Sequence, residues 1–164
     1  MKSLVINTSS SLFFTKIGLI PKLIKEFRLI TTPEIYNELK EGEQIGYKDA
    51  KIIIQYIGED KISMLNAKNT KEIAKQFGIK EIDASTIALA QEQNGLLATE
   101  DRQIEKICLI TQTKITNTVV LIYYLWKKRR LNYEQALLLL ELLVKQGYNK
   151  EACIKIKGKI IQEV

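Results

Sequence analysis

The sequence of 164 residues contains no histidine, and this absence excludes several kinds of catalytic site. A Ser-His-Asp triad, a Cys-His pair and a histidine general base all require the missing imidazole. A zinc site is excluded too, because the chain has only two cysteines, Cys108 and Cys153. Any acid–base or metal chemistry must therefore use carboxylates, lysines or tyrosines, and a bound metal must be a hard cation with oxygen ligands.

Other scarce features exclude further classes of protein. Two prolines and eight glycines are too few for a linker or a low-complexity segment. No glycine pair has the spacing of a nucleotide-binding loop, which argues against an ATPase, a GTPase or an NAD-dependent enzyme. No apolar run approaches the roughly 18 residues of a membrane span, and we expect no signal peptide. These features predict a cytoplasmic protein with free, buried cysteines and no membrane partner.

The composition is that of a folded protein with a basic surface. Hydrophobic residues make up 46% and charged residues 27% of the chain, which is typical of one globular domain. The 25 lysines and arginines exceed the 19 acidic residues, so the net charge is +6. This charge favours a polyanionic partner such as nucleic acid. The alternative is an organism whose proteins are generally rich in lysine.

Short apolar runs alternate with helical patterns along most of the chain, which predicts an α/β fold with a parallel sheet and helices on both faces. We expect one domain over residues 1–164, in which residues 118–164 form a helical C-terminal part. The predicted strands are 4–7, 28–31, 62–65, 96–99 and 114–116. The predicted helices are 12–27, interrupted near 18–21, then 33–41, 48–57, 69–77, 81–94 and 101–108, with three more starting near Thr118, Asn132 and Asn149.

Polar and acidic residues follow the first and fourth predicted strands. Asn7, Thr8 and Ser9 come after the first strand, and Glu100, Asp101 and Arg102 after the fourth. In parallel sheets, functional sites lie at the carboxyl ends of the strands.

Two more carboxylates belong to neighbouring helices. Asp83 lies in the first turn of the helix before the fourth strand, and Glu38 lies late in the helix after the second. Carboxylates gathered in one cleft repel each other unless a cation neutralises them. Mg²⁺ or Mn²⁺ suits such ligands, and either ion activates water for the hydrolysis of a phosphodiester.

These motifs, taken in sequence order, resemble the PIN domain family of metal-dependent ribonucleases. The motifs are Asn-Thr-Ser at residues 7–9, PEIYNELK with Glu38, IDASTIALA with Asp83, and ATEDR with Glu100 and Asp101. The tail from Arg129 to Glu151 is similar to the helical end of one prokaryotic branch of PIN-like proteins. The resemblance covers most of the chain.

The resemblance implies a three-layer α/β/α sandwich with strand order 3-2-1-4-5, and hydrolysis of RNA. It implies that Mg²⁺ or Mn²⁺ is held by Glu38, Asp83, Asp101 and Asn7, with Glu100, Thr8, Ser9 and Arg102 in support. Many members of the family are VapC-type toxins that a protein antitoxin holds inactive, and many are homodimers. For Arg102, contact with the scissile phosphate and pairing with Glu100 or Glu105 both remain open.

The chain departs from the family pattern at Asn7, where most active PIN domains have Asp. Asn keeps a carbonyl oxygen, removes one negative charge and adds an NH₂ donor. The resembling branch often has Asn here, and Glu100 would restore the lost charge. Weaker Mg²⁺ binding is therefore expected, and a binding module for RNA or protein that does not cleave is the alternative to a nuclease. A third interpretation is an interaction protein whose acidic cleft accepts a basic partner segment.

Features near the C-terminus also have two interpretations each. The basic run Lys127, Lys128, Arg129 and Arg130 either contacts nucleic-acid phosphates or forms a solvated helix end. Tyr123, Tyr124 and Trp126 form either a stacking platform for bases or a packing surface. The leucine-rich segment 137–143 is either fully buried or a surface for self-association.

Overall fold

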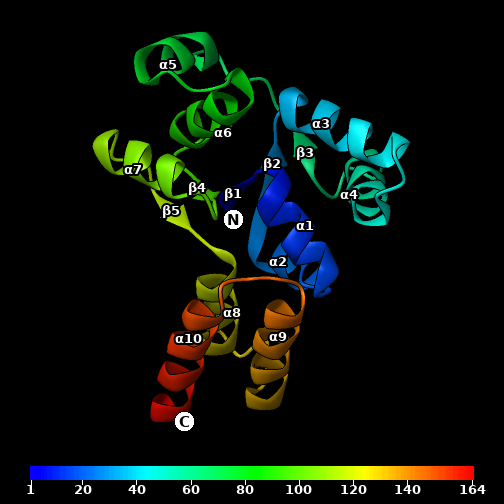
Figure 1. Cartoon of the computed structure of the whole chain (residues 1–164), viewed down its shortest axis with the longest axis vertical. Helices are drawn as coiled ribbons and strands as arrows, with labels where there is room; N and C mark the ends of the chain where they lie inside the picture. The colour runs from blue at the N-terminus through cyan, green and yellow to red at the C-terminus, as the bar shows by residue number, and fades with distance from the viewer.

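The computed structural model describes residues 1–164 and contains a five-stranded parallel sheet surrounded by ten helices (Figure 1). Along the sheet the strands have the order β3-β2-β1-β4-β5. The strands are β1 (Lys2–Ile6), β2 (Phe27–Thr31), β3 (Ser63–Met64), β4 (Leu96–Ala98) and β5 (Ile115–Thr116). The helices are α1 (Thr8–Lys16), α2 (Ile20–Glu26), α3 (Pro33–Gln44), α4 (Lys48–Gly58), α5 (Thr70–Phe77), α6 (Glu81–Glu92), α7 (Arg102–Ile110), α8 (Thr118–Lys127), α9 (Tyr133–Lys145) and α10 (Lys150–Glu163). The predicted α/β fold and its strand order are confirmed.

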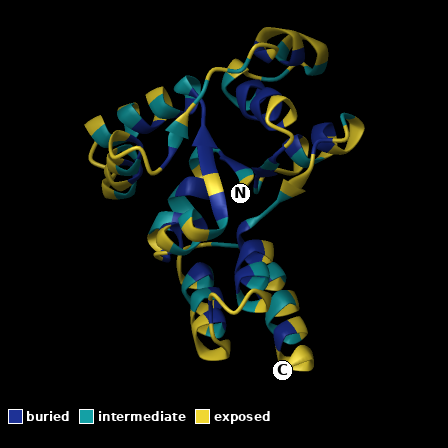
Figure 2. Ribbon diagram, turned by 180° about the vertical axis from the view of Figure 1, so that it is seen from behind, coloured by how far each residue is buried: buried dark blue, intermediate teal, exposed yellow.

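The central strand β1 separates two hydrophobic cores, because successive side chains of a strand point to opposite faces. Leu4 and Ile6 face a core shared with α1 to α4 and with α8 to α10. Val5 faces a smaller core shared with α5, α6 and α7. These two groups of helices lie on opposite sides of the sheet in Figure 1, and buried residues fill the strands and inner helix faces in Figure 2. The result is a three-layer sandwich.

The three C-terminal helices, α8 to α10, extend away from the sheet at one end of the molecule (Figure 1). Leu121, Leu140 and Ile160 nevertheless belong to the same hydrophobic core as Leu4 of β1. Within the leucine-rich segment 137–143, Leu140 and Leu143 are buried while Leu138 is 54% exposed. The segment therefore packs through one side and is not buried all round.

None of the ten helices combines the length and the apolar character that a crossing of a lipid bilayer requires.

Element boundaries differ from prediction by a few residues, for local reasons. Helix α1 begins at Thr8, four residues early, because the Asn7 side chain already caps it. The predicted interruption is shorter than expected, because Gly18 alone takes a positive φ and Pro21 fits the first turn of α2. Both cysteines are free and buried, as expected, and burial raises the pKa of Cys108 to about 11.

Gly95 is required by the close approach of β4 to β1, and not by the turn that precedes it. The sequence predicts an Asn94-Gly95 stop for α6, and it is Asn94 that takes the left-handed conformation, with φ 46°. A Cβ atom added at Gly95 would lie 2.8 Å from the carbonyl oxygen of Ser3. Any side chain at Gly95 therefore pushes β4 away from the strand that supports the acidic residues.

We expect Gly95→Ala to lower the free energy of unfolding by about 1–3 kcal/mol, the usual cost of overpacking a tight contact. Urea denaturation of the purified variant measures this. Gly158→Ala in α10 is the matched control, because no atom lies within 4 Å of its added Cβ. The control should be more stable by about 0.5–1 kcal/mol. Equal behaviour of the two variants would contradict the steric explanation.

Candidate active site

Six of the predicted site residues line one cleft at the carboxyl edge of the sheet. The cleft is a cavity of about 260 Å³ whose polar lining comes from Asn7, Thr8, Ser9, Glu38, Asp83 and Asp101. Leu12, Ile35 and Ile104 form its apolar walls. The residues come from the ends of β1 and β4 and from α3 and α6, so the parallel topology brings together residues up to 94 positions apart, 101 minus 7.

Asn7 and Asp101 occupy equivalent positions, because each follows a central strand and caps the next helix. Asp101 Oδ1 accepts hydrogen bonds from the backbone N–H groups of Gln103 at 2.7 Å and Ile104 at 3.3 Å. This leaves the second carboxylate oxygen of Asp101 available to the cleft. The cap therefore fixes the side chain and does not consume its whole capacity as a ligand.

The helix cap at Asn7 leaves no side-chain oxygen free for a ligand, unlike the cap at Asp101. Asn7 Oδ1 accepts from the backbone N–H of Ser10 at 2.9 Å and from the Ser9 hydroxyl at 3.3 Å. Since the carbonyl oxygen already has two donors, the group of Asn7 that remains is an NH₂, which repels a cation. An aspartate at this position would offer a free oxygen in its place.

A chain of buried hydrogen bonds positions the helices that carry Glu38 and Asp83. The Ile35 N–H donates to the Thr32 hydroxyl at 3.3 Å, which pairs with the Ser85 hydroxyl at 2.8 Å. Ser85 in turn donates to the carbonyl of Ile82 at 2.7 Å. The chain joins the first turn of α3 to the first turn of α6. Ser85 was not predicted as a site residue; the available signal was its place two residues before the apolar run Ile87–Ala90, on a helix that is buried over residues 84–90.

Thr8 positions Glu38 within the cleft. The Thr8 hydroxyl donates a hydrogen bond to Glu38 Oε2 across the gap between α1 and α3. Ser9 acts on Asn7, as described above. Both residues therefore orient a neighbouring side chain of the cleft, and each also lies in the first turn of α1.

The electrostatics of the cleft are unfavourable for three bare carboxylates. The pKa of Asp83 is raised above its ordinary value, first by burial and then by repulsion from Asp101 and Glu38. The nearby Lys80 opposes this shift. This coupling shows that the three acids act on one another, and a cation placed among them would relieve the repulsion.

The donor set fits a hard divalent cation held partly through water. Carboxylate oxygens with few direct contacts and several waters are the usual environment of Mg²⁺. No three acidic side chains in the structure are placed to hold one metal ion together. Glu38, Asp83 and Asp101 are the candidate ligands because they line the cleft, but at least one of them would have to act through water. Asn7 contributes no free side-chain oxygen.

Glu100 lies outside this cleft, which differs from the expectation that it adds charge there. It accepts from the backbone N–H of Thr118 at 2.9 Å, from the Thr118 hydroxyl and from the Tyr148 hydroxyl. Burial raises the pKa of Glu100, while these donors oppose the shift. The residue thereby joins the end of β4 to α8 and to the loop before α10.

Arg102 also faces away from the cleft. It lines a separate cavity of about 500 Å³ together with Glu100, Glu105 and Lys155. Arg102 forms no ion pair with Glu100 or Glu105 in the structure, so both of its interpretations stay predictions.

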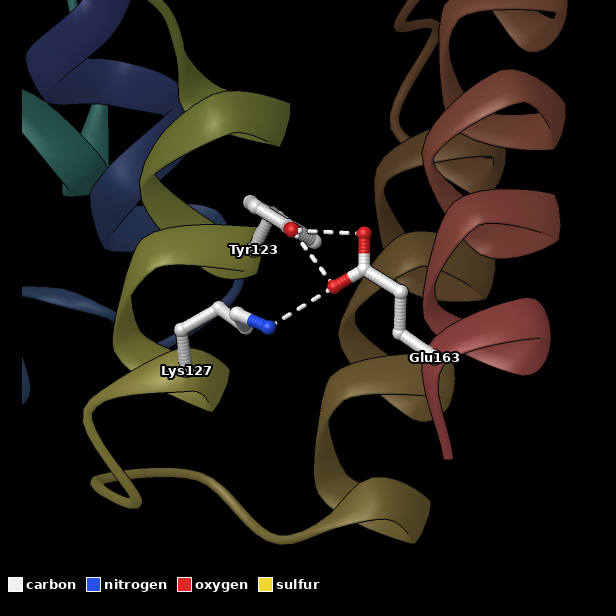
Figure 3. Close-up of polar contacts among 3 residues, drawn as sticks. All are labelled: Tyr123, Lys127 and Glu163. Atoms are coloured by element: carbon white, nitrogen blue, oxygen red, sulfur yellow. Dashed lines mark hydrogen bonds and ion pairs between the residues drawn. The ribbon is translucent and has the colours of Figure 1, made fainter.

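The basic run at residues 127–130 has local partners at the far end of α8. Lys127 donates to Glu163 at 2.8 Å, and the Tyr123 hydroxyl donates to the same carboxylate at 2.7 Å (Figure 3). These two donors lower the pKa of Glu163. Arg130 pairs with Glu26. Contact of Lys127, Lys128, Arg129 and Arg130 with nucleic acid stays a prediction.

The aromatic residues of α8 serve mainly as packing groups. Tyr124 packs against Phe27 of β2, with ring centroids 5.4 Å apart. Tyr123 and Trp126 are half-buried, and the centroids of their rings are 5.8 Å apart.

The chain belongs to the PIN domain family: residues 3–158 match the model of the DUF3368 family, which is described as a PIN domain. PIN domains are generally nucleases and typically use divalent metal ions. A comparison with curated proteins gives no match.

Two solved structures are similar to this chain. The crystal structure of PAE2754 from Pyrobaculum aerophilum is 18% identical and has a TM-score of 0.51, and the match covers 73% of this chain and 92% of that chain. A domain of a functionally unknown protein from Methanocaldococcus jannaschii is 22% identical with a TM-score of 0.46, covering 72% of this chain and 91% of that chain. The first likeness shows that the sheet and its helices have the arrangement of that structure.

We expect Asp83→Asn to stabilise the protein in EDTA at pH 7, by about 0.5–1 kcal/mol, as often follows when a strained functional group is removed. Water screens this half-buried carboxylate, which keeps the gain small. Because the folded pKa is raised, the ionised side chain destabilises the fold above that pKa and has no effect well below the ordinary value of 3.8. The gain should therefore disappear as the pH falls through this range.

Urea denaturation between pH 3 and pH 7 measures the difference, with Asp60→Asn as control. Asp60 is exposed and has a positive φ that asparagine tolerates. A gain for Asp83→Asn that is constant with pH would contradict the electrostatic origin.

Proposed function

We propose that this protein is a Mg²⁺- or Mn²⁺-dependent ribonuclease that hydrolyses phosphodiester bonds of RNA. The observation that supports this proposal is the convergence of Glu38, Asp83 and Asp101 in one cleft, where burial and then repulsion from the other two acids raise the pKa of Asp83. The net charge of +6 favours a polyanionic substrate, although the cleft itself is acidic. A cation is what allows the phosphate to enter such a cleft.

The residues of the cleft have distinct roles in this proposal. Asp101 offers the oxygen that its helix cap leaves free, and Glu38 is held toward the cleft by Thr8. Burial and the neighbouring acids raise the pKa of Asp83, and a cation beside it would relieve this destabilisation of its charge. When bound, the cation lowers the pKa of an attacking water and stabilises the charge that develops on the phosphate.

We expect the purified protein to cleave a mixed set of labelled RNAs in Mn²⁺ or Mg²⁺ and to lose this activity in EDTA. Asp101→Asn should reduce the rate at least a hundred-fold, on the order of the loss of one electrostatic catalytic group. Asparagine caps a helix as well as aspartate does, so the variant should keep its fold. Gel analysis of the products measures the rate.

The control for this experiment is Glu134→Gln in the first turn of α9, which changes one charge away from the cleft. It should cleave at the wild-type rate. Cleavage that persists in EDTA, or that Asp101→Asn retains, would exclude the cleft as the source of activity.

The second candidate function is an RNA- or protein-binding module that does not cleave. The observation that favours it is the cap at Asn7, whose only carbonyl oxygen is already bonded to Ser9 and Ser10. The cleft therefore has one oxygen fewer for a cation than a first-position aspartate would give.

We expect Asn7→Asp to bind Mg²⁺ about ten-fold more tightly than the wild type, a difference of about 1.4 kcal/mol. Aspartate keeps the cap to Ser10 and replaces the NH₂ group with a free oxygen. Isothermal titration of both proteins with Mg²⁺ measures the affinities. Equal affinities would show that residue 7 does not contribute to cation binding.

Three finer aspects stay proposals from the sequence. A VapC-like toxin would bind an antitoxin, whose basic segment the acidic cleft would accept. We also propose that the protein is a homodimer and lies in the cytoplasm. The two free buried thiols are compatible with a reducing compartment.

A further inference from the structure

A second cavity lies directly beside the acidic cleft and shares three of its residues. The cavity has a volume of about 280 Å³, and Thr8, Leu12 and Glu38 line both spaces. Its other lining residues are Leu39, Glu41, Gly42, Ile45, Tyr47 and Ala50. It lies among α1, α3 and α4, which are neighbours on one side of the sheet in Figure 1. We call it the Tyr47 pocket.

The turn between α3 and α4 fixes the place of Tyr47. Gly46 has φ 98° and donates its N–H to the carbonyl of Glu43 at 3.1 Å. The Tyr47 N–H donates to the carbonyl of Gly42 at 3.0 Å. These two bonds are those of a Schellman motif, which ends a helix and brings the residue after the glycine back against the last turn.

Gly42 provides the surface on which the Tyr47 ring lies. A Cβ atom added at Gly42 would be 3.2 Å from Cδ2 of Tyr47, which is closer than ordinary contact. The ring is thus held by backbone on one side, while the Tyr47 side chain as a whole stays 61% exposed. Ile45 is 73% exposed beside it. Exposed apolar side chains held in place by a rigid turn form a prepared binding surface.

The negative charge of the pocket favours a base of a nucleic acid over a phosphate. Glu38 and Glu41 are its charged lining residues, and neither lysine nor arginine contributes. A phosphate is therefore repelled, whereas an uncharged planar ring stacks on tyrosine and a base amino group donates to a carboxylate. The volume lies just below the range of pockets for drug-sized ligands, which suits a single base.

We propose that the Tyr47 pocket binds one unpaired nucleobase of the RNA beside the bond that is cleaved, stacked on Tyr47 with its amino group donating to Glu41. This inference rests on the proposed ribonuclease function and adds a preference for adenine, cytosine or guanine over uracil. Uracil has no amino group, and its one Watson–Crick donor, N3–H, is flanked by two carbonyl oxygens that a carboxylate repels, so it meets Glu41 less favourably.

Equilibrium binding in EDTA tests the pocket separately from cleavage. The probes are short fluorescein-labelled homopolymers of adenosine, cytidine and uridine, and an abasic sugar–phosphate chain of equal length, measured by anisotropy. Wild-type protein should bind the adenosine and cytidine chains more tightly than the other two. Tyr47→Ala should weaken binding of these two chains roughly ten-fold, as for one lost base stack, and leave the abasic chain unaffected.

Three further variants separate the contributions. Tyr47→Phe should keep the stacking and the affinity. Glu41→Gln should keep the affinity for the adenosine chain within about two-fold while reducing the preference over uridine, because an amide also accepts a hydrogen bond but more weakly. Tyr133→Ala, at another partly exposed tyrosine on α9, should behave as the wild type.

The outcomes distinguish this inference from the proposed function. Unchanged affinity in Tyr47→Ala, or an equal loss for the abasic chain, overturns the inference. If the folded wild-type protein binds none of the nucleic-acid chains, the inference is also overturned. The pocket would then fit an apolar side chain of a protein partner. Loss of base-dependent binding in Tyr47→Ala, from a protein that cleaves no RNA with either metal, supports the pocket and contradicts the ribonuclease.

Discussion

The geometry of the acidic cleft depends on the buried hydrogen bond between Thr32 and Ser85. It connects α3, which carries Glu38, to α6, which carries Asp83, and each hydroxyl has a further backbone partner. Both side chains are almost fully buried, so neither is satisfied by water if the other is lost, at a cost of about 1–3 kcal/mol. The pair therefore stabilises one separation of the two helices and sets how close the carboxylates come.

Helix caps perform a second task at this edge of the sheet. The same side chains that begin α1 and α7 face the cleft, so the local signal that ends a strand also places the site residues. The consequence differs between the two positions. Asp101 keeps an oxygen that a cation could use, whereas Asn7 keeps an NH₂ group, which is why we propose that residue 7 weakens cation binding. The pKa of Asp83 is raised first by burial and then by repulsion from Asp101 and Glu38, and a cation would relieve that repulsion.

Local signals at strand ends and helix starts predict the parallel sheet and its helices. The strand order and the meeting of Asn7, Glu38, Asp83 and Asp101 come from the resemblance to the PIN domain family. The sequence does not predict the position of Glu100 correctly. Glu100 instead accepts hydrogen bonds from Thr118 and Tyr148, which lie 18 and 48 positions further along the chain and have no local signal that links them to it. The Thr32–Ser85 bond joins residues 53 positions apart, and the Tyr47 pocket depends on the packing of three helices. Neither has a periodic signal in the sequence.

We propose that Glu38, Asp83 and Asp101 hold a divalent cation in the cleft, at least one of them through water. Paramagnetic relaxation by substoichiometric Mn²⁺, followed in the amide NMR spectrum, locates the ion directly. We predict that the strongest broadening affects the amide signals around residues 7–9, 38, 83 and 101. The Asp101→Asn variant should show less broadening at these positions. Equal broadening around surface carboxylates such as Glu59 and Glu134, with none at the cleft, would contradict the claim.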